Sequence, residues 1–447
     1  MTVLHLERPG PTRHERRSQP ATPRPGLTFA GLGVPAPIVA ALAREGITEP
    51  FPIQSATLPD SLEGRDVLGR GQTGSGKTLA FCIPLVAALA GGFTLAGRPR
   101  GLVLIPTREL ASQVHAVLSP LASAAGLSVV TIYGGIPQGR QVAALRERAD
   151  IVVACPGRLA DLMEQGHCHL GDVEVSVLDE ADHMADLGFL PVVRRLLAAT
   201  PPGGQRMLFS ATLDHDVDVL VRRFLANPAV HSVDPGATPI PVVHHVLTIS
   251  ASDRLGVVAS LAAGRHRSLI FTRTKHAAGK LRRQLTTVGI PAAELHGNLA
   301  QNARERNLAA FSSGAVRVLV ATDIAARGIH VDGINLVIHA DPPAADKAYV
   351  HRSGRTARAG ASGIVVTLQT AAQSRDVSAL MRRAGVIPLR ARVGPDSRLL
   401  AEIAGPQADW IPPARLPSQA VTASSASLAS GRSAAALSAG YRGRRRR

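Results

Sequence analysis

The chain has 447 residues, enough for two domains, and 45% of them are hydrophobic, enough for ordinary cores. Its formal net charge of +17 favours a polyanionic partner, nucleic acid before an acidic membrane surface, although abundant Ala, Gly and Pro equally fit a GC-rich genome. Three cysteines indicate a reducing compartment without a disulfide framework, and the N-terminus has no apolar signal segment.

Short β-branched runs alternate with amphipathic helical patterns from Asp66 onward. The first series of expected strands lies at 66–69, 101–107, 127–134, 150–156, 173–182 and 205–212. Apolar strands that alternate with helices predict a parallel sheet covered on both faces. The Pro- and Gly-rich stretch 227–243 is interpreted as a linker.

The alternation then restarts, with strands expected at 244–250, 267–274, 290–297, 316–323, 335–341 and 363–369. The fold class is therefore α/β, with two such domains in tandem. We expect a first domain at 27–235, a linker at 236–242 and a second domain at 243–390. Basic, low-complexity segments at 1–26 and 391–447 are expected to be disordered, and five Arg in the last six positions would bind polyanions without specificity.

The segment "GQTGSGKT" matches the phosphate-loop pattern G-x-x-x-x-G-K-[ST] between an expected strand and an expected helix. Its backbone N–H groups would wrap the phosphates of a nucleotide, Lys77 would reach the β- and γ-phosphates, and Thr78 would ligate Mg²⁺. The loop residues are Gly71, Gln72, Thr73, Gly74, Ser75, Gly76, Lys77 and Thr78. The uncharged run 79–97 that follows is interpreted as a buried helix, with a membrane span as the weaker alternative.

Two adjacent carboxylates follow an apolar strand in "VLDEAD". Asp179 stands where such a fold places its Mg²⁺-orienting acid, and Glu180 can polarise an attacking water.

Through these motifs, the sequence resembles the bacterial-type DEAD-box RNA helicases of superfamily 2. The resemblance extends over residues 29–375. Asp179-Glu180-Ala181-Asp182 is the box that names the family. The resemblance implies RecA-like domains, ATP as substrate with Mg²⁺, and RNA as partner, single-stranded or as a short duplex. It implies a cytoplasmic ATP hydrolase that needs neither a membrane nor an oligomer, and whose basic tail adds nonspecific RNA binding.

Further first-domain motifs agree with this resemblance. "GITEPFPIQ" resembles the Q motif, in which Gln54 would pair with adenine. Within this motif, Phe51 stands where the family often has Thr. Upstream of it, Phe29 has the spacing of the aromatic residue that stacks on the base. "PTREL", "GG" and "CPGR" resemble segments that grip an RNA backbone, with Cys155 at a usual Thr position. Their expected RNA-binding residues are Arg108, Gly135, Gly157 and Arg158. Ser210 and Thr212 of "SAT" are expected to hydrogen-bond toward Asp182 and to couple ATP to RNA.

The second domain supplies the remaining motifs. "HGNLAQNAR" and "VATDIAARGIH" contain Gln301, expected to couple, and Arg304 and Thr322, expected to bind RNA. "HRSGRTAR" supplies the expected catalytic residues His351, Arg355 and Arg358, the two Arg acting as fingers toward the γ-phosphate. Ala357 replaces a usual Gly, which matters only if its φ is positive.

One departure concerns the ribose of ATP. His330 stands where the family usually has Asp, and Asp332 could compensate if the segment is extended. We expect ATP-dependent, RNA-stimulated opening of short RNA duplexes or displacement of RNA-bound proteins. The alternatives are an ATP-gated RNA clamp or chaperone with little unwinding and a DNA-directed superfamily 2 helicase.

Overall fold

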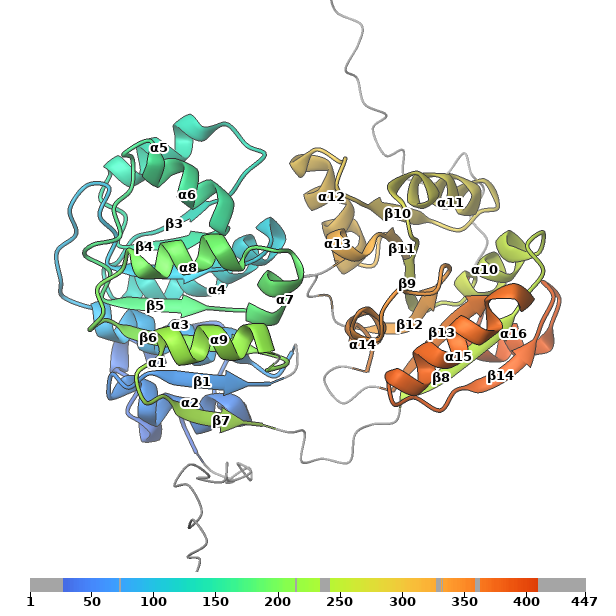
Figure 1. The fold of residues 1–447 in the computed structure, drawn as a ribbon, viewed down its shortest axis with the longest axis horizontal. Coiled ribbons are helices and arrows are strands. Elements are labelled where there is room, and N and C mark those ends of the chain that lie inside the picture. Colours follow the sequence, from blue (N-terminus) through green and yellow to red (C-terminus); the bar gives the residue numbers. More distant parts are fainter. Residues whose placement is uncertain are drawn as a thin grey trace, which may run out of the picture.

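Each of the two domains is built on a seven-stranded, wholly parallel sheet (Figure 1). The structure is a computed structural model, and it describes residues 27–71, 74–213, 215–233, 242–326, 331, 333–357 and 362–408. The tandem α/β arrangement predicted from the alternating pattern is confirmed.

The first sheet has the strand order β3-β4-β2-β5-β6-β1-β7. Its strands are β1 Val67–Arg70, β2 Gly101–Leu104, β3 Val129–Ile132, β4 Ile151–Ala154, β5 Val175–Leu178, β6 Gln205–Ser210 and β7 Ala229–Ser232. The helices are α1 Ala36–Arg44, α2 Pro52–Leu62, α3 Lys77–Leu89, α4 Arg108–Ala124, α5 Gln138–Arg146, α6 Pro156–Glu164, α7 Ala181–Asp186, α8 Leu190–Ala198 and α9 His215–Phe224, preceded by the 3₁₀ turn η1 Ala30–Leu32.

The second sheet has the order β10-β11-β9-β12-β13-β8-β14, which is the same order as the first when each strand is counted from the start of its own domain. Its strands are β8 Val242–Thr248, β9 Arg267–Phe271, β10 Ala292–Leu295, β11 Val318–Ala321, β12 Ile334–His339, β13 Gly363–Gln369 and β14 Leu389–Arg392. The helices are α10 Arg254–Ala262, α11 Lys275–Thr287, α12 Gln301–Ser312, α13 Asp323–Ala326, α14 Asp346–Ser353, α15 Ser374–Arg383 and α16 Arg398–Ala404, with the 3₁₀ turn η2 Ala371–Gln373.

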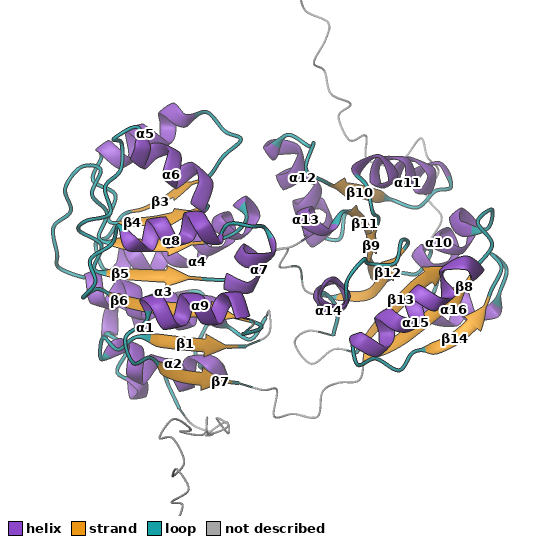
Figure 2. Ribbon diagram, in the orientation of Figure 1, coloured by secondary structure: helices purple, strands orange, loops and turns teal. Residues whose placement is uncertain are grey.

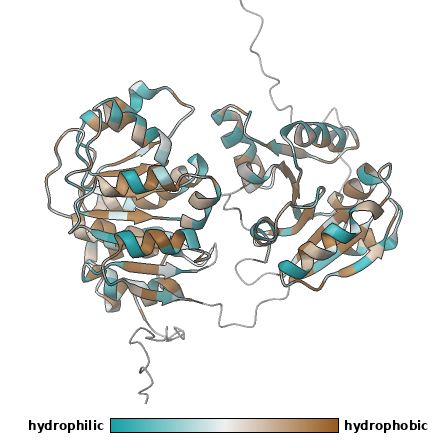
Figure 3. Cartoon of the chain, viewed as in Figure 1, coloured by the Kyte–Doolittle hydropathy of each residue, from teal (hydrophilic) through white to brown (hydrophobic). Residues whose placement is uncertain are grey.

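Helices cover both faces of each sheet, so the strands bury side chains in two directions (Figure 2). In β2, Val103 packs into one core of the first domain, whereas Leu102 and Leu104 pack into the other. This alternation follows from the two-residue period of a strand. The central strands are accordingly hydrophobic, while many hydrophilic residues lie on the helices (Figure 3).

The run 79–97 does not form one continuous segment. Its apolar residues belong to α3, which ends at Leu89 and is buried along most of its length against the first-domain core. Within the described parts of the chain, no helix has the length and apolar character that a membrane crossing requires.

The linker interpretation of 227–243 is wrong for residues 229–232, which form β7 and pair with β1 inside the expected first domain. The expected end of the second domain at 390 is also wrong. Residues 391–408, assigned to the C-terminal tail, belong to the second domain, because β14 pairs with β8 and α16 buries Leu400 and Ile403 in its core. Both elements are short and occur in polar or Pro- and Gly-rich surroundings, so only their partners in the fold reveal them.

Candidate active site

The phosphate loop leads from β1 into α3 at the carboxyl edge of the first sheet. Gly71 donates its N–H to Ser210 O at 3.2 Å, which ties the start of the loop to β6. Gly74 and Gly76 have φ values of 89° and 90°, a region that favours glycine. The buried Lys77 ammonium donates to Gly71 O at 2.9 Å across the loop. Gln72 and Thr73 lie outside the described residues.

A hydrogen-bonding group in this loop lacks a partner. Ser75 Oγ is buried and makes no hydrogen bond to the described residues. Buried hydroxyls are nearly always paired, so this atom together with the amino end of α3 fits a phosphate oxygen as its acceptor.

The carboxylates predicted from "VLDEAD" lie directly opposite the loop. Glu180 Oε1 is 3.6 Å from Lys77 Nζ, and Asp179 and Glu180 are both buried. Glu180 has a φ of 54°, a left-handed conformation that is strained for a residue with a side chain. Such strain is concentrated at functional sites.

Burial raises the pKa of Asp179 to about 7, with the Lys77 ammonium lowering it and the Glu180 carboxylate raising it. Lys77 therefore only partly compensates for two adjacent buried carboxylates. A divalent cation between Asp179 and the phosphates would supply the missing positive charge. The Asp179 carboxylate and the Thr78 hydroxyl are oxygen donors of the type that Mg²⁺ prefers, so these residues fit the metal.

Asp182, two residues beyond Glu180, holds the "SAT" segment. Its Oδ2 accepts from Thr212 N at 3.0 Å and from Thr212 Oγ1 at 2.8 Å. Ser210 Oγ accepts from Asp182 N at 3.3 Å and donates to Thr212 O at 2.7 Å. The predicted hydrogen bonds between these three residues are thus present, and they connect the carboxylate segment to the end of β6.

The two residues expected at the adenine base are both buried. Gln54 Oε1 accepts from Phe51 N, and Gln54 Nε2 donates to Gly76 O, each at 2.9 Å. The Gln54 amide therefore joins the Q segment to the phosphate loop. Phe29 is only 2% exposed and packs in the first-domain core, so in this structure its ring offers no face for stacking.

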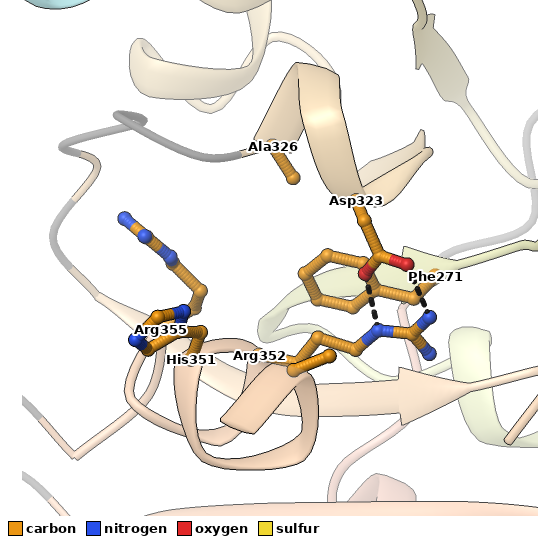
Figure 4. Close-up of a pocket in the computed structure, with 7 residues that line it drawn as sticks. Phe271, Asp323, Ala326, His351, Arg352 and Arg355 are labelled. Atoms are coloured by element: carbon orange, nitrogen blue, oxygen red, sulfur yellow. Dashed lines mark hydrogen bonds and ion pairs between the residues drawn. The ribbon is translucent and has the colours of Figure 1, made fainter. Parts of the chain in front are cut away.

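The second half of the site comes from α14 and the turn that follows it. A pocket there is lined by Phe271, Asp323, Ala326, Ala348, His351, Arg352 and Arg355. Figure 4 shows His351 and Arg355 on one side of this pocket and the paired Arg352 and Asp323 on the other. Arg358 lies outside the described residues, as do His330 and Asp332 of the expected ribose contact.

Arg352 was absent from the expected site, yet several contacts hold its buried guanidinium. Its Nη2 donates to Asp323 Oδ2 at 2.7 Å, its Nη1 donates to Asp341 O at 2.9 Å, and its guanidinium lies 5.0 Å from the centre of the Phe271 ring. Its place inside "HRSGRTAR" gives no signal in the sequence that separates it from Arg355. Ala357, two residues after Arg355, has a φ of 55°, so the replacement of a glycine there is strained.

Among the expected RNA-binding residues of the first domain, Arg108 and Gly135 depend on each other. A Cβ atom on Gly135 would lie 2.0 Å from Arg108 Nη1, so the glycine leaves room for the arginine. Arg158 donates to Ile136 O at 3.4 Å, and Gly157 lies beside it in the first turn of α6 with open space around its Cα.

The expected second-domain residues meet the first domain. Arg304 Nε lies 2.6 Å from Glu109 Oε1, and both side chains are buried. Gln301 Oε1 accepts from Arg108 Nη1 at 3.4 Å. Arg304 therefore makes an interdomain ion pair, as a buried guanidinium needs a partner, and its expected RNA contact stays a prediction. Thr322 follows β11 and donates its N–H to Leu295 O.

A second interdomain contact joins α7 to α14, which lie on the facing sides of the two domains (Figure 1). Lys347 Nζ is 2.7 Å from Asp186 Oδ1, and His351 Nδ1 is 3.7 Å from Asp186 Oδ2. Glu109, Asp186 and Lys347 were not among the expected site residues. Pairs that are over a hundred residues apart leave no trace in one sequence, although Glu109 lies inside the quoted "PTREL".

A phosphate loop with its carboxylates on one domain and an arginine pocket on a second domain of the same strand order define the class of two-domain RecA-like helicases. Residues 51–220 match the DEAD/DEAH box helicase family model, and residues 252–360 match that of the helicase conserved C-terminal domain.

Curated relatives agree with these matches. The ATP-dependent RNA helicase RhlB of Pseudomonas syringae is 37% identical over 374 residues, 81% of this chain and 94% of the relative. The chloroplastic DEAD-box ATP-dependent RNA helicase 3B of Zea mays is 42% identical over 370 residues, 80% of this chain. The chain spans about half the length of this maize relative (49%). The chain belongs to the DEAD-box helicase family.

Solved structures show the same fold. Saccharomyces cerevisiae Dbp5 bound to RNA and ADP BeF3 superposes with a TM-score of 0.72 at 25% identity, over 85% of this chain and 100% of that one. Mss116 bound to ssRNA and UDP-BeF gives a TM-score of 0.72 at 25% identity, over 86% of this chain and 83% of that one.

Proposed function

We propose that this protein hydrolyses ATP in an RNA-stimulated reaction and uses the cycle to open short RNA duplexes or to displace RNA-bound proteins. One observation carries the proposal: the phosphate loop with Glu180 and the arginine pocket with Arg355 lie on different domains, and ion pairs join those domains. The names of the relatives support both ATP and RNA as ligands.

In this proposal Lys77 and the amino end of α3 hold the β- and γ-phosphates. Glu180 accepts a proton from the water that attacks the γ-phosphorus, and ADP leaves as the bond to the β-phosphate oxygen breaks. Arg355, with Arg358, neutralises the charge that develops on the transferred phosphoryl group. Mg²⁺, held by Asp179 and Thr78, would supply charge neutralisation between the phosphates.

Each domain holds half of the proposed site, so ATP and RNA would each contact both domains. Each ligand would therefore favour the conformation in which the two domains are in contact. Each ligand should therefore raise the affinity for the other. The proposed RNA contacts are to the backbone, so sequence preference should be weak; they are made by Arg108, Gly135, Gly157, Arg158, Arg304 and Thr322. The basic residues 430–447 would add salt-sensitive affinity without specificity.

We place this activity in the cytoplasm, on the argument that all three cysteines are unpaired and two of them are buried, as a reducing compartment allows.

The test compares the ATPase rate of the full chain with no nucleic acid, with single-stranded RNA and with DNA of the same sequence. RNA should stimulate the rate and DNA should not. Glu180→Gln should abolish hydrolysis and keep ATP and RNA binding, whereas Glu164→Gln, on an exposed surface pair, should behave like the parent. Stimulation by DNA alone would favour a DNA-directed helicase, and RNA binding gated by ATP without turnover would favour a clamp.

A further inference from the structure

Tyr349 joins helix α14 to the sheet of the second domain. Its side chain is fully buried, while that of the next residue, Val350, is 49% exposed. Arg352 is also buried and lies three residues further on, so Tyr349 and Arg352 point from the same face of the helix into the domain. Arg355, which lines the pocket, follows in the turn just after α14.

Tyr349 packs on a row of side chains from adjacent strands. Phe271 of β9, His339 of β12 and Thr367 of β13 are direct cross-strand neighbours. The buried His339 ring lies 6.0 Å from the Phe271 ring and 5.1 Å from the Tyr349 ring, between ring centres, and is nearly perpendicular to both. His339 Nδ1 shares a hydrogen bond of 3.0 Å with Thr367 Oγ1, which limits rotation of the imidazole. The surface under Tyr349 is therefore well ordered.

The hydroxyl of Tyr349 is held by His244 of β8. Tyr349 Oη and His244 Nδ1 share a hydrogen bond of 2.7 Å. Burial raises the pKa of Tyr349 to about 12, while burial and the neighbouring His245 lower the pKa of His244. Both groups are therefore uncharged at neutral pH, and the bond needs no ion pair.

Arg352 provides a second anchor for the same helix. Its guanidinium binds Asp323 and lies beside the Phe271 ring, as Figure 4 shows. Two anchors three residues apart restrict the rotation of α14 about its own axis, which a single anchor would permit. Because Arg355 follows directly after the helix, a rotation of α14 would displace its guanidinium.

We propose that Tyr349 is a positioning residue for Arg355 and that His244 acts by holding the Tyr349 hydroxyl. This inference rests on the proposed function, in which Arg355 acts on the γ-phosphate. Neither Tyr349 nor His244 lines the pocket, so each would act through the orientation of α14. A misplaced catalytic group lowers the rate of the chemical step more than it weakens ligand binding.

The test measures single-turnover ATP hydrolysis by the full chain, and the ATP and RNA concentrations that give half-maximal rates. Tyr349→Phe keeps the ring and removes the hydroxyl. It should lower turnover about three- to thirtyfold, within the ~10²-fold that a displacement of 1 Å can cost, and leave both half-maximal concentrations within about twofold. His244→Leu should do the same, whereas His244→Asn, whose amide can replace Nδ1 as a hydrogen-bonding group, should retain most of the activity.

An Arg355→Ala background separates positioning from a general structural role. In that background Tyr349→Phe should cause no further loss of turnover, because the residue that it positions is gone. A further loss of the same size as in the parent would overturn the proposal, and so would unchanged turnover in Tyr349→Phe alone. Circular dichroism checks that each variant is folded, and His244→Leu replaces Tyr349→Phe in this comparison if the latter is not.

His245 provides a matched control, because it is a buried histidine of the same strand whose side chain points to the opposite face of the sheet. His245→Leu should hydrolyse ATP like the parent. A loss as large as that of His244→Leu would overturn the proposal, since it would assign the effect to the strand as a whole. If the parent itself showed no RNA-stimulated hydrolysis and matched Glu180→Gln, the proposed function would fail instead.

Discussion

Lys347 Nζ of the second domain lies 2.7 Å from Asp186 Oδ1 of the first, which places one ion pair between the helix that follows Glu180 and the helix that precedes Arg355. His351 shares the same carboxylate at 3.7 Å. The pair connects the two halves of the active site directly.

We expect Lys347→Ala to raise the RNA concentration that gives half-maximal ATPase a few-fold, with a smaller effect on turnover at saturating RNA. The pair is partly exposed, and such pairs contribute up to about 1 kcal/mol. Titration of the steady-state ATPase with RNA is the measurement. In a double-mutant cycle, Asp186→Asn combined with Lys347→Ala should cost less than the sum of the single changes; strict additivity would show that the pair does not couple the domains.

Arg355→Ala should reduce turnover by about 10³-fold or more, because a finger acts on charge that develops in the transition state. ATP affinity should change little. Single-turnover hydrolysis at saturating ATP and RNA measures this, and Arg390→Ala, an exposed arginine on the edge strand β14, serves as the matched control. A loss of less than tenfold would be incompatible with a finger.

Arg352→Ala should instead act on stability. It removes a buried guanidinium that binds Asp323, Asp341 O and the Phe271 face, a loss on the order of 3 kcal/mol in the free energy of unfolding. Denaturant unfolding followed by circular dichroism is the measurement, with Arg355→Ala as the comparison. Unchanged stability in Arg352→Ala would mean that these contacts contribute nothing net.

Ala357→Gly should increase the free energy of unfolding by up to about 1 kcal/mol, because glycine relieves the left-handed strain and costs some chain entropy. Ala348→Gly, a change of the same size inside α14, should decrease it by about 1 kcal/mol. Thermal unfolding of both variants measures the two changes in stability, which should have opposite signs. A loss of stability in Ala357→Gly would show that the turn relaxes in solution.

Cys155→Thr should strengthen RNA binding about fivefold and stabilise α6. Burial raises the pKa of the Cys155 thiol to about 12, so the group stays protonated and is a poor donor. It begins α6 without a side-chain cap, whereas a threonine hydroxyl caps a helix and can bond a phosphate. Fluorescence anisotropy with labelled RNA measures the binding, and Cys155→Val, which lacks the hydroxyl, should gain nothing.

The raised pKa of Cys155 also predicts how the free energy of unfolding changes with pH. An unfolded thiol has a pKa near 9.0, lower than that of folded Cys155, so unfolding releases a proton above pH 9 and stability falls as the pH rises from 9 toward 12. Cys155→Thr should flatten this fall. An equally steep decline in the variant would assign it to other groups whose pKa values burial raises, which include Cys82, Cys168 and Tyr349.

The sequence was sufficient for the alternating architecture and for the nucleotide half of the site, because contiguous apolar strands and the phosphate loop are local patterns. It was insufficient for Glu109 with Arg304 and Asp186 with Lys347, since these contacts depend on how two domains meet. The burial of Phe29 and the exposure of Phe51 were equally hidden, because both residues are apolar and only tertiary packing decides which ring is covered. The positive φ of Ala357 is a property of the folded turn.

The two sheets share a strand order, but the connections that follow their corresponding strands β1 and β8 differ in sequence. In the first sheet Gly71, after β1, bonds to the end of β6, and in the second Ile249, after β8, bonds in the same way to the end of β13. The connection from β8 to α10 at 249–253 contains no glycine, so it cannot wrap a triphosphate as the glycine-bearing loop does. The two domains share one architecture but differ in chemistry. In the proposed reaction the first domain binds the nucleotide, and the second domain supplies Arg355 to that same site.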